Sequence, residues 1–188
     1  EQLASLRTIP NMTLLRPADP NETAEAWKYA IEHRSGPVAI ALTRQKVPTI
    51  DRTKYAAAKN FSTGSYVLAE SSTKPDIILI GTGSEVQFVI GAYEQLAKNG
   101  IAARVVSMPS WELFEGQPKE YRESVVTSSI KKRLAVEAGV PMGWHKYVGD
   151  GGVIVGITKF GASAPYEVLM KEYGFTVENV VKKAEELL

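Results

Sequence analysis

The chain has 188 residues, with 22 Lys+Arg against 21 Asp+Glu and no cysteine. This length fits one complete domain or one domain plus part of another, and the composition is that of an ordinary globular protein. A net charge of +1 argues against nucleic acid as a partner. No apolar run reaches the roughly 18 residues of a membrane span. The absence of cysteine excludes disulfides and thiolate sites. We therefore expect a cytoplasmic protein with neither nucleic-acid nor membrane partners.

The first part of the chain predicts two short strands and two helices. Residues 1–7 have the pattern of a helix already under way, so we expect further chain upstream. Asp19, Pro20 and Glu22 form a typical helix start, because Asp19 can cap the free amides and Pro20 presets the backbone. The expected elements are a helix over 1–7, a strand over 12–15, a helix over 21–33 and a strand over 38–42, which we expect to be buried on both faces.

Residues 48–60 interrupt this pattern. Their apolar periodicity fades, and proline, charged and polar side chains dominate, which is typical of a linker. We therefore divide the chain into residues 1–47, a linker over residues 48–60, and a domain over residues 61–188.

The second part alternates strands with helices. We expect residues 108–117 to form a loop that carries aromatic side chains. The expected strands are 65–69, 76–80, 101–106, 133–137 and 153–157, and the expected helices lie within 85–99, 118–126, 165–173 and 176–188. This alternation predicts an α/β fold, a three-layer sandwich with a mostly parallel, mixed sheet.

A Gly-x-Gly turn joins the strand that ends near Ile80 to the following helix. A dinucleotide fingerprint needs a third small residue at the sixth position, where Val86 stands, so we do not expect a dinucleotide. Two interpretations remain. The turn is either a plain strand-to-helix connection capped by Ser84, or a weak anion site at the amides of Gly83 and Ser84.

The other candidate residues are the two histidines and one arginine. His33 ends a helix, where a structural role is favoured, and His145 has no serine or cysteine nucleophile motif beside it, so we expect neither a catalytic residue nor a metal site. Arg44 follows an apolar strand, and parallel sheets bind ligands beyond the carboxyl ends of their strands. Its guanidinium could bind a phosphate or carboxylate, or form a salt bridge at the sheet edge.

A succession of motifs resembles the carboxyl-terminal third of the transketolase family. The resemblance runs from residue 1 to residue 188 in the family's order. Its motifs are Arg16-Pro17-Ala18-Asp19, Thr43-Arg44-Gln45, Gly81-Thr82-Gly83-Ser84-Glu85-Val86, Arg104-Val105-Val106-Ser107-Met108-Pro109, Tyr121-Arg122-Glu123-Ser124-Val125, Val136-Glu137-Ala138-Gly139, Lys146-Tyr147-Val148-Gly149 and Phe160-Gly161-Ala162-Ser163-Ala164-Pro165.

The resemblance implies a parent enzyme of the pentose phosphate pathway that uses thiamine diphosphate with Mg or Ca. Such an enzyme is a homodimer that moves a two-carbon ketol unit from a ketose phosphate to an aldose phosphate. The resemblance makes residues 1–47 the tail of a pyrimidine-binding domain and residues 61–188 the carboxyl-terminal domain. Arg44 matches the family arginine that contacts the substrate phosphate. The catalytic, cofactor and metal residues belong to upstream family segments, and His33 and His145 match none of them.

We expect the chain alone to bind no cofactor and to be inactive, with a structural or regulatory role for its carboxyl-terminal domain. Residues 1–47 should either pack against that domain or be poorly ordered, because two strands and a helix cannot complete a sheet. One alternative is an anion- or nucleotide-sensing or assembly module that uses the amides of Gly83 and Ser84. Another is a fragment of a related ketol transferase such as dihydroxyacetone synthase.

Overall fold

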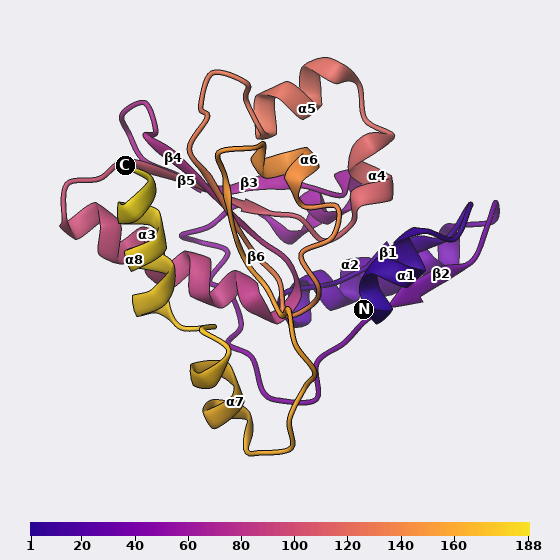
Figure 1. The fold of residues 1–188 in the computed structure, drawn as a ribbon. Helices are drawn as coiled ribbons and strands as arrows, with labels where there is room; N and C mark the ends of the chain where they lie inside the picture. The colour runs from indigo at the N-terminus through magenta and orange to yellow at the C-terminus, as the bar shows by residue number, and fades with distance from the viewer.

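The computed structural model describes all 188 residues and divides their strands between two sheets (Figure 1). β1 (Thr13–Leu15) and β2 (Val38–Ile40) pair in parallel as a two-stranded sheet. The larger sheet has the order β3 (Tyr66–Glu70), β5 (Ala103–Ser107), β4 (Ile77–Gly81), β6 (Arg133–Val136) and β7 (Val153–Val155). β3 is antiparallel to β5 and the other pairs are parallel, so the predicted mixed, mostly parallel sheet is confirmed.

The larger sheet lies between two helical layers. Every residue of the central strand β4 is buried, and its side chains alternate between two apolar clusters. Ile77 and Leu79 face the cluster beneath α3 (Val86–Lys98) and α8 (Val177–Leu187). Ile78 and Ile80 face the opposite cluster, which takes side chains from α4 (Trp111–Glu115), α5 (Lys119–Val125) and α6 (His145–Val148). The predicted three-layer α/β sandwich is therefore correct (Figure 1).

The helices at the end of the chain form where the sequence indicates. Thr176 caps α8, its hydroxyl accepting a hydrogen bond from the amide of Asn179, and Val180, Val181 and Ala184 form the buried face of that helix. α7 (Tyr166–Glu172) begins after Pro165 and has no buried residue, although Met170 packs against the main apolar cluster. None of the eight α-helices combines the length and apolar composition that a membrane crossing requires.

Two predicted elements differ from the structure. Residues 108–117 were expected to form a loop, but they contain α4, because Ser110 accepts a hydrogen bond from the amide of Leu113 and starts a helical turn. The strand at 38–42 was expected to be buried on both faces. β2 is only half-buried, and Leu42 beyond it is 54% exposed. The reason is that β2 has a single neighbouring strand and is not covered by helices on both of its faces.

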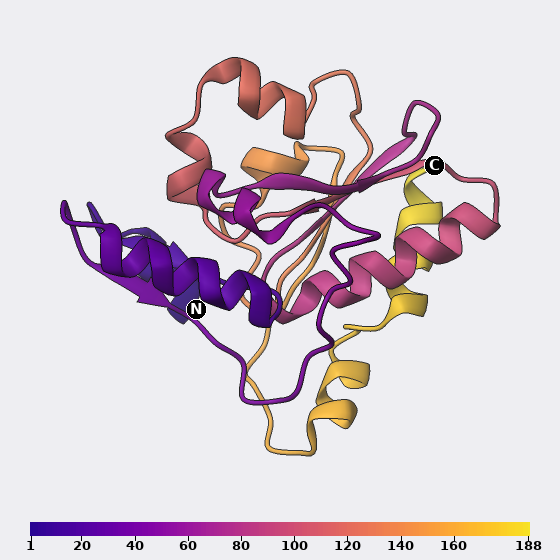
Figure 2. The same ribbon diagram turned by 180° about the vertical axis from the view of Figure 1, so that it is seen from behind.

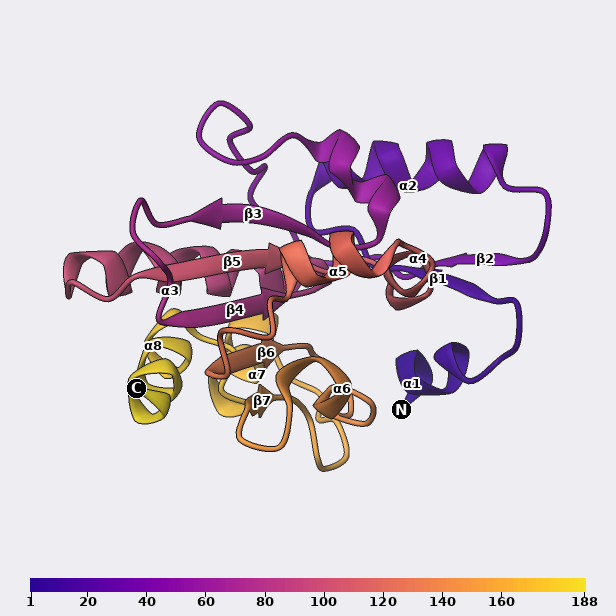
Figure 3. The same cartoon turned by 90° about the horizontal axis from the view of Figure 1, so that it is seen from above.

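Residues 1–47 pack against the rest of the molecule, beyond the carboxyl ends of β4 and β5 (Figure 3). This segment consists of α1 (Gln2–Arg7), β1, α2 (Pro20–Glu32) and β2. Asp19 caps α2 as predicted, accepting a hydrogen bond of 2.9 Å from the amide of Glu22. α2 lies along η1 (Ala58–Thr63) (Figure 2). Leu15, Ala26 and Phe61 form a small apolar cluster between these elements and β1.

The connection between the two parts is not a bare linker. Ile50 and Tyr55 are buried in the main apolar cluster. Arg52 donates a hydrogen bond of 2.9 Å to the carbonyl of Ala56 and one of 3.0 Å to Asp19. The polar composition of residues 48–60 therefore reflects a segment that wraps around the surface while inserting a few apolar side chains.

Candidate functional site

The carboxyl ends of three strands from both sheets meet at one place. Arg16 directly follows β1, Glu85 ends the short turn η2 (Gly83–Glu85) after β4, and Glu137 directly follows β6. The Arg16 amide donates to the carbonyl of Pro109 at 2.8 Å, and the Gly83 amide donates to the carbonyl of Arg16 at 3.1 Å. The backbone of the smaller sheet is thus bonded to the loops at the carboxyl edge of the larger one.

Arg16 forms ion pairs with two buried carboxylates at this junction. Its guanidinium lies 3.0 Å from Glu85 Oε2 and 3.1 Å from Glu137 Oε1, and the side chains of both glutamates are almost fully buried. Arg7 adds a bidentate pair to Glu137, at 2.8 and 2.6 Å, and the indole N–H of Trp144 donates to the same carboxylate at 2.7 Å. Burial opposes charge on Glu137, but Arg7 first, and then Arg16 and Trp144, hold its pKa below the ordinary value.

Gly83 makes room for this guanidinium. Its φ of +57° lies in the left-handed region, and a Cβ atom there would come within 2.9 Å of the Arg16 guanidinium carbon. The next residue, Ser84, is buried and donates its hydroxyl to Glu85 at 2.5 Å. α3 starts after Glu85 and has no side-chain cap, so the interpretation in which Ser84 caps this helix is wrong. The Arg16 guanidinium lies against Gly83, and the Glu85 carboxylate accepts from Ser84.

A second buried polar network surrounds Glu22. Its carboxylate accepts hydrogen bonds from Tyr66 Oη at 2.5 Å, from the Ala18 amide at 2.8 Å and from Ser107 Oγ at 2.8 Å. Full burial raises the pKa of Glu22, although these three donors oppose that rise. The network joins α2 to β3 and β5, so a second set of buried polar contacts links residues 1–47 to the larger sheet.

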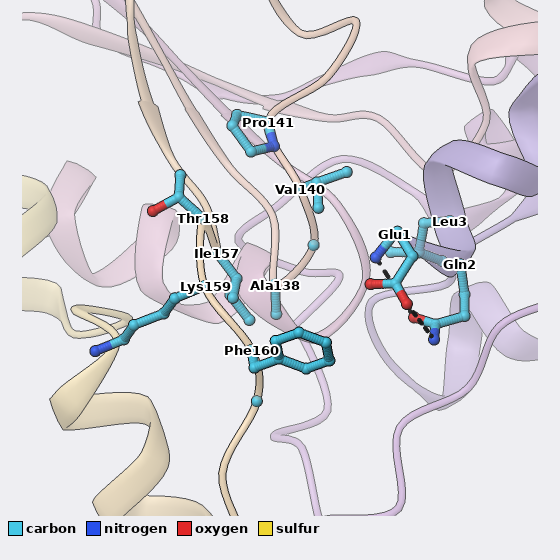
Figure 4. Close-up of a pocket in the computed structure, with 12 residues that line it drawn as sticks. Glu1, Gln2, Leu3, Ala138, Val140, Pro141, Ile157, Thr158, Lys159 and Phe160 are labelled. Carbon is cyan, nitrogen blue, oxygen red and sulfur yellow. Dashed lines mark hydrogen bonds between the residues drawn. The ribbon is translucent and has the colours of Figure 1, made fainter.

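Two cavities lie at the same edge. The larger, about 480 Å³, separates Glu1, Gln2 and Leu3 from the loops after β6 and β7 (Figure 4). Phe160 on its rim is 97% exposed, and Lys159 is the only lysine or arginine that lines it. The smaller, about 240 Å³, is lined by residues that include Thr43, Gln45, Ser84, Glu85 and Arg16.

These residues do not by themselves fit a diphosphate with a divalent cation. Such a group needs several oxygen ligands for the metal and convergent donors for the phosphates. The chain brings together no group of three or more His, Cys, Asp or Glu side chains that could hold a metal ion. Glu85 and Glu137 are already paired with arginine, and the larger cavity offers a single lysine.

Arg44 is exposed and stands just outside the smaller cavity. It follows β2 in a bend, and it forms no ion pair with any carboxylate of the chain, whereas its neighbours Thr43 and Gln45 line that cavity together with Ser84. The guanidinium of Arg44 is therefore free to meet a ligand, while Gly83 and Ser84 lie buried nearby.

His33 contacts two hydroxyl groups of its own segment, and the Ser35 hydroxyl lies 3.3 Å from its Nε2. His33 stacks on Tyr29, with ring centroids 5.1 Å apart, and its Nδ1 lies 2.9 Å from the Tyr29 hydroxyl. His145 begins the short helix α6.

Sequence analysis did not identify Arg7, Arg16, Glu85 and Glu137 as a group. They come from segments up to 130 residues apart, which no local pattern connects. A usable signal existed, because Arg16 and Glu137 each stand directly after an apolar strand, at the edge where α/β sheets gather functional groups.

Two family models match the chain in order along its sequence. Residues 1–49 match the transketolase pyrimidine-binding domain, and residues 64–176 match the transketolase-like TK C-terminal domain. The transketolase of Aquifex aeolicus is 53% identical over 186 residues, which are 99% of this chain and 27% of that protein. The chain therefore spans about a quarter of the length of the curated relatives it matches.

Solved structures agree with this match. Transketolase from Leishmania mexicana superposes with a TM-score of 0.92 at 36% identity, covering 100% of this chain and 27% of that one. A Pichia stipitis transketolase in complex with sedoheptulose 7-phosphate gives 0.89 at 38% identity, covering 98% and 26%. A split-gene transketolase, described as an inactive β4 tetramer, gives 0.80 at 26% identity, covering 100% of this chain and 61% of that one.

Proposed function

Because the chain belongs to the transketolase family, we propose that it is the carboxyl-terminal part of an enzyme that transfers a two-carbon ketol unit from a ketose phosphate to an aldose phosphate. The observation that carries this proposal is the ordered match of residues 1–49 and 64–176 to two successive domains of the family. A pyrimidine-binding domain implies thiamine diphosphate in the parent enzyme, and we propose Mg or Ca as its metal and the cytoplasm as its location.

Within that enzyme, we assign residues 1–47 to the end of the pyrimidine-binding domain, residues 48–60 to the connection, and residues 61–188 to the carboxyl-terminal domain. A second subunit and sugar phosphates are the proposed partners of the parent. The Pichia stipitis relative, solved with sedoheptulose 7-phosphate, supports the substrate class.

We assign Arg44 the role of binding the substrate phosphate. Three facts support this role: Arg44 follows a parallel strand at its carboxyl end, its side chain is exposed, and no carboxylate of the chain neutralises it. A guanidinium in such a place can form two parallel hydrogen bonds to a phosphate.

The chain alone should be inactive, since a cofactor carries the chemistry of this family and the residues present do not form its site. The relative described as an inactive β4 tetramer supports this expectation. The test supplies the 188-residue chain with thiamine diphosphate, magnesium, xylulose 5-phosphate and ribose 5-phosphate, with a full-length transketolase as positive control. We expect no sedoheptulose 7-phosphate from the chain, and clear turnover would contradict its assignment as an inert part.

A further inference from the structure

Three aromatic side chains and one glutamate of the larger domain form a pocket. The rings of Trp111, Trp144 and Tyr147 meet edge to face, with centroids 5.0 Å apart for the two tryptophans, 5.1 Å for Trp111 and Tyr147, and 5.9 Å for Trp144 and Tyr147. Glu137 closes the pocket and is held by the indole N–H of Trp144 at 2.7 Å. All four residues lie within the matched carboxyl-terminal domain, so that domain builds the pocket by itself.

Arg7 of the pyrimidine-binding segment fills this pocket. Its guanidinium carbon lies 3.8 Å from the centroid of the Trp111 ring and 5.9 Å from that of Trp144. Both terminal nitrogens bond Glu137, one to each oxygen, at 2.8 and 2.6 Å. The Arg7 side chain is 8% exposed although α1 is a short surface helix. One planar cation thus bonds both oxygens of the carboxylate and lies over an aromatic ring, while Arg16 adds a contact of 3.1 Å to the same carboxylate.

This geometry selects a guanidinium over an ammonium ion. A guanidinium is flat, stacks on an aromatic ring and presents paired donors that match both oxygens of a carboxylate. An ammonium ion is a compact point charge that cannot meet Glu137 in a bidentate way while lying over Trp111. The left-handed Gly143, where a Cβ would come within 2.7 Å of the Trp111 ring, lets the backbone approach closely beneath that ring.

We propose that the carboxyl-terminal domain carries a guanidinium-binding pocket, formed by Trp111, Trp144, Tyr147 and Glu137, and that Arg7 docks the pyrimidine-binding segment by occupying it. The ligand class is an alkylguanidinium, supplied in this structure by the chain's own arginine. The pocket is independent of the proposed substrate role of Arg44, which forms none of these contacts. Arg7 is a positioning residue in this account.

The test measures thermal unfolding of the full 188-residue chain in the variants Arg7→Ala, Arg7→Lys and Arg34→Ala. Arg34 is an exposed arginine of the same segment and serves as the matched control. We expect Arg7→Ala to lower the melting temperature by several degrees, Arg7→Lys to lower it by nearly as much, and Arg34→Ala to leave it unchanged.

The same variants are then titrated with methylguanidinium chloride or methylammonium chloride at up to 20 mM. Methylguanidinium should restore at least half of the melting temperature lost in Arg7→Ala, and methylammonium should restore none. Adding Trp111→Leu to Arg7→Ala should abolish that rescue. If Arg7→Ala does not fold, the yield of refolding with each salt gives the same comparison. Equal rescue by both salts, no rescue by methylguanidinium, or a wild-type melting temperature in Arg7→Lys would overturn the proposal.

Discussion

The two sheets of this molecule are stabilised in different ways, although both begin from apolar runs of similar appearance. β4 is buried along its whole length between two helical layers. β2 has one neighbouring strand and is half-buried, and the nearby Trp27, Ile31 and Leu42 are more than half exposed. The number of layers that cover a strand, rather than its own composition, decides how much apolar area it buries.

The smaller sheet is instead joined to the larger one by buried charge. Its apolar cluster has three fully buried residues, whereas Arg7 and Arg16 reach across to Glu85 and Glu137. Directional pairs of this kind fix the position of a segment more than they add to net stability, because removing charges from water costs nearly as much as their attraction returns. We therefore expect apolar substitutions to weaken the larger sheet, and charge substitutions to release the smaller one.

The largest expected effect on stability is that of an Ile→Ala substitution in β4, and the same substitution in β2 provides the comparison. Ile80→Ala in β4 should lower the free energy of unfolding by about 2–5 kcal/mol, because it leaves a cavity in a fully buried site. Ile40→Ala in β2 should cost about 1 kcal/mol, since that side chain is only half-buried. Unfolding in urea measures both values, and equal costs would contradict the proposed difference between the sheets.

Glu137→Gln should have the next largest effect and should act on the junction. It leaves Arg7 and Arg16 without their shared countercharge, and breaking a buried pair in this way costs about 3 kcal/mol. Amide hydrogen exchange should then quicken in β1 before it quickens in β4. Glu186→Gln, whose pair with Lys183 is exposed, is the control and should leave stability unchanged. Uniform exchange changes across both sheets would argue against a local release.

The pH dependence of stability offers a smaller effect with a defined sign. The folded-state pKa of Glu137 is lowered, so its contribution is present above the ordinary glutamate pKa of about 4.3 and is lost as the pH falls through the folded value. Stability should decline by up to about 1.4 kcal/mol per pH unit between the two pKa values, and Glu137→Gln should remove that decline. Parallel profiles for wild type and variant below pH 4.3 would show that the prediction is wrong.

The pKa of Glu22 is shifted in the opposite direction, so its pH dependence provides a comparison. Its folded-state pKa is raised, so its contribution is complete below about pH 4.3 and is lost as the pH rises through the folded value. Glu22→Gln should therefore flatten the profile above pH 4.3, whereas Glu137→Gln flattens it below that pH.

The sequence predicts those parts of the fold that repeat a local pattern. The apolar runs at 76–80 and 133–137 and the amphipathic pattern of α8 each identify an element of the larger domain, because strand and helix periodicities are short-range signals. α4 was missed because five residues contain too few turns to show a helical period. The exposure of β2 was missed because burial depends on how many elements cover a strand.

The candidate site also contains residues that the sequence predicts and contacts that only the structure shows. Arg44 was predicted from its position after a strand, which is a local feature, and from the family resemblance, which rests on motifs along the whole chain. The pairing of Arg7 and Arg16 with Glu137 depends on chain segments 121–130 residues apart, and it becomes visible only when the two sheets are placed side by side. Gly83 was noted as part of a Gly-x-Gly turn with a possible anion site, and in the structure its left-handed backbone makes room for the Arg16 guanidinium.

Arg44→Ala should have the smallest effect on stability, within about 0.5 kcal/mol, because the side chain is exposed and unpaired. Its effect on substrate binding tests the central claim, that this part of a transketolase contributes a phosphate-binding arginine. The measurement is the KM for ribose 5-phosphate and for ribose in a full-length transketolase that carries these residues, with Arg34→Ala as control. Losing a charge-assisted contact worth about 1.5–3 kcal/mol should raise the KM for ribose 5-phosphate at least about tenfold and leave that for ribose unchanged. An unchanged KM for ribose 5-phosphate, or an equal rise for both sugars, would contradict the account.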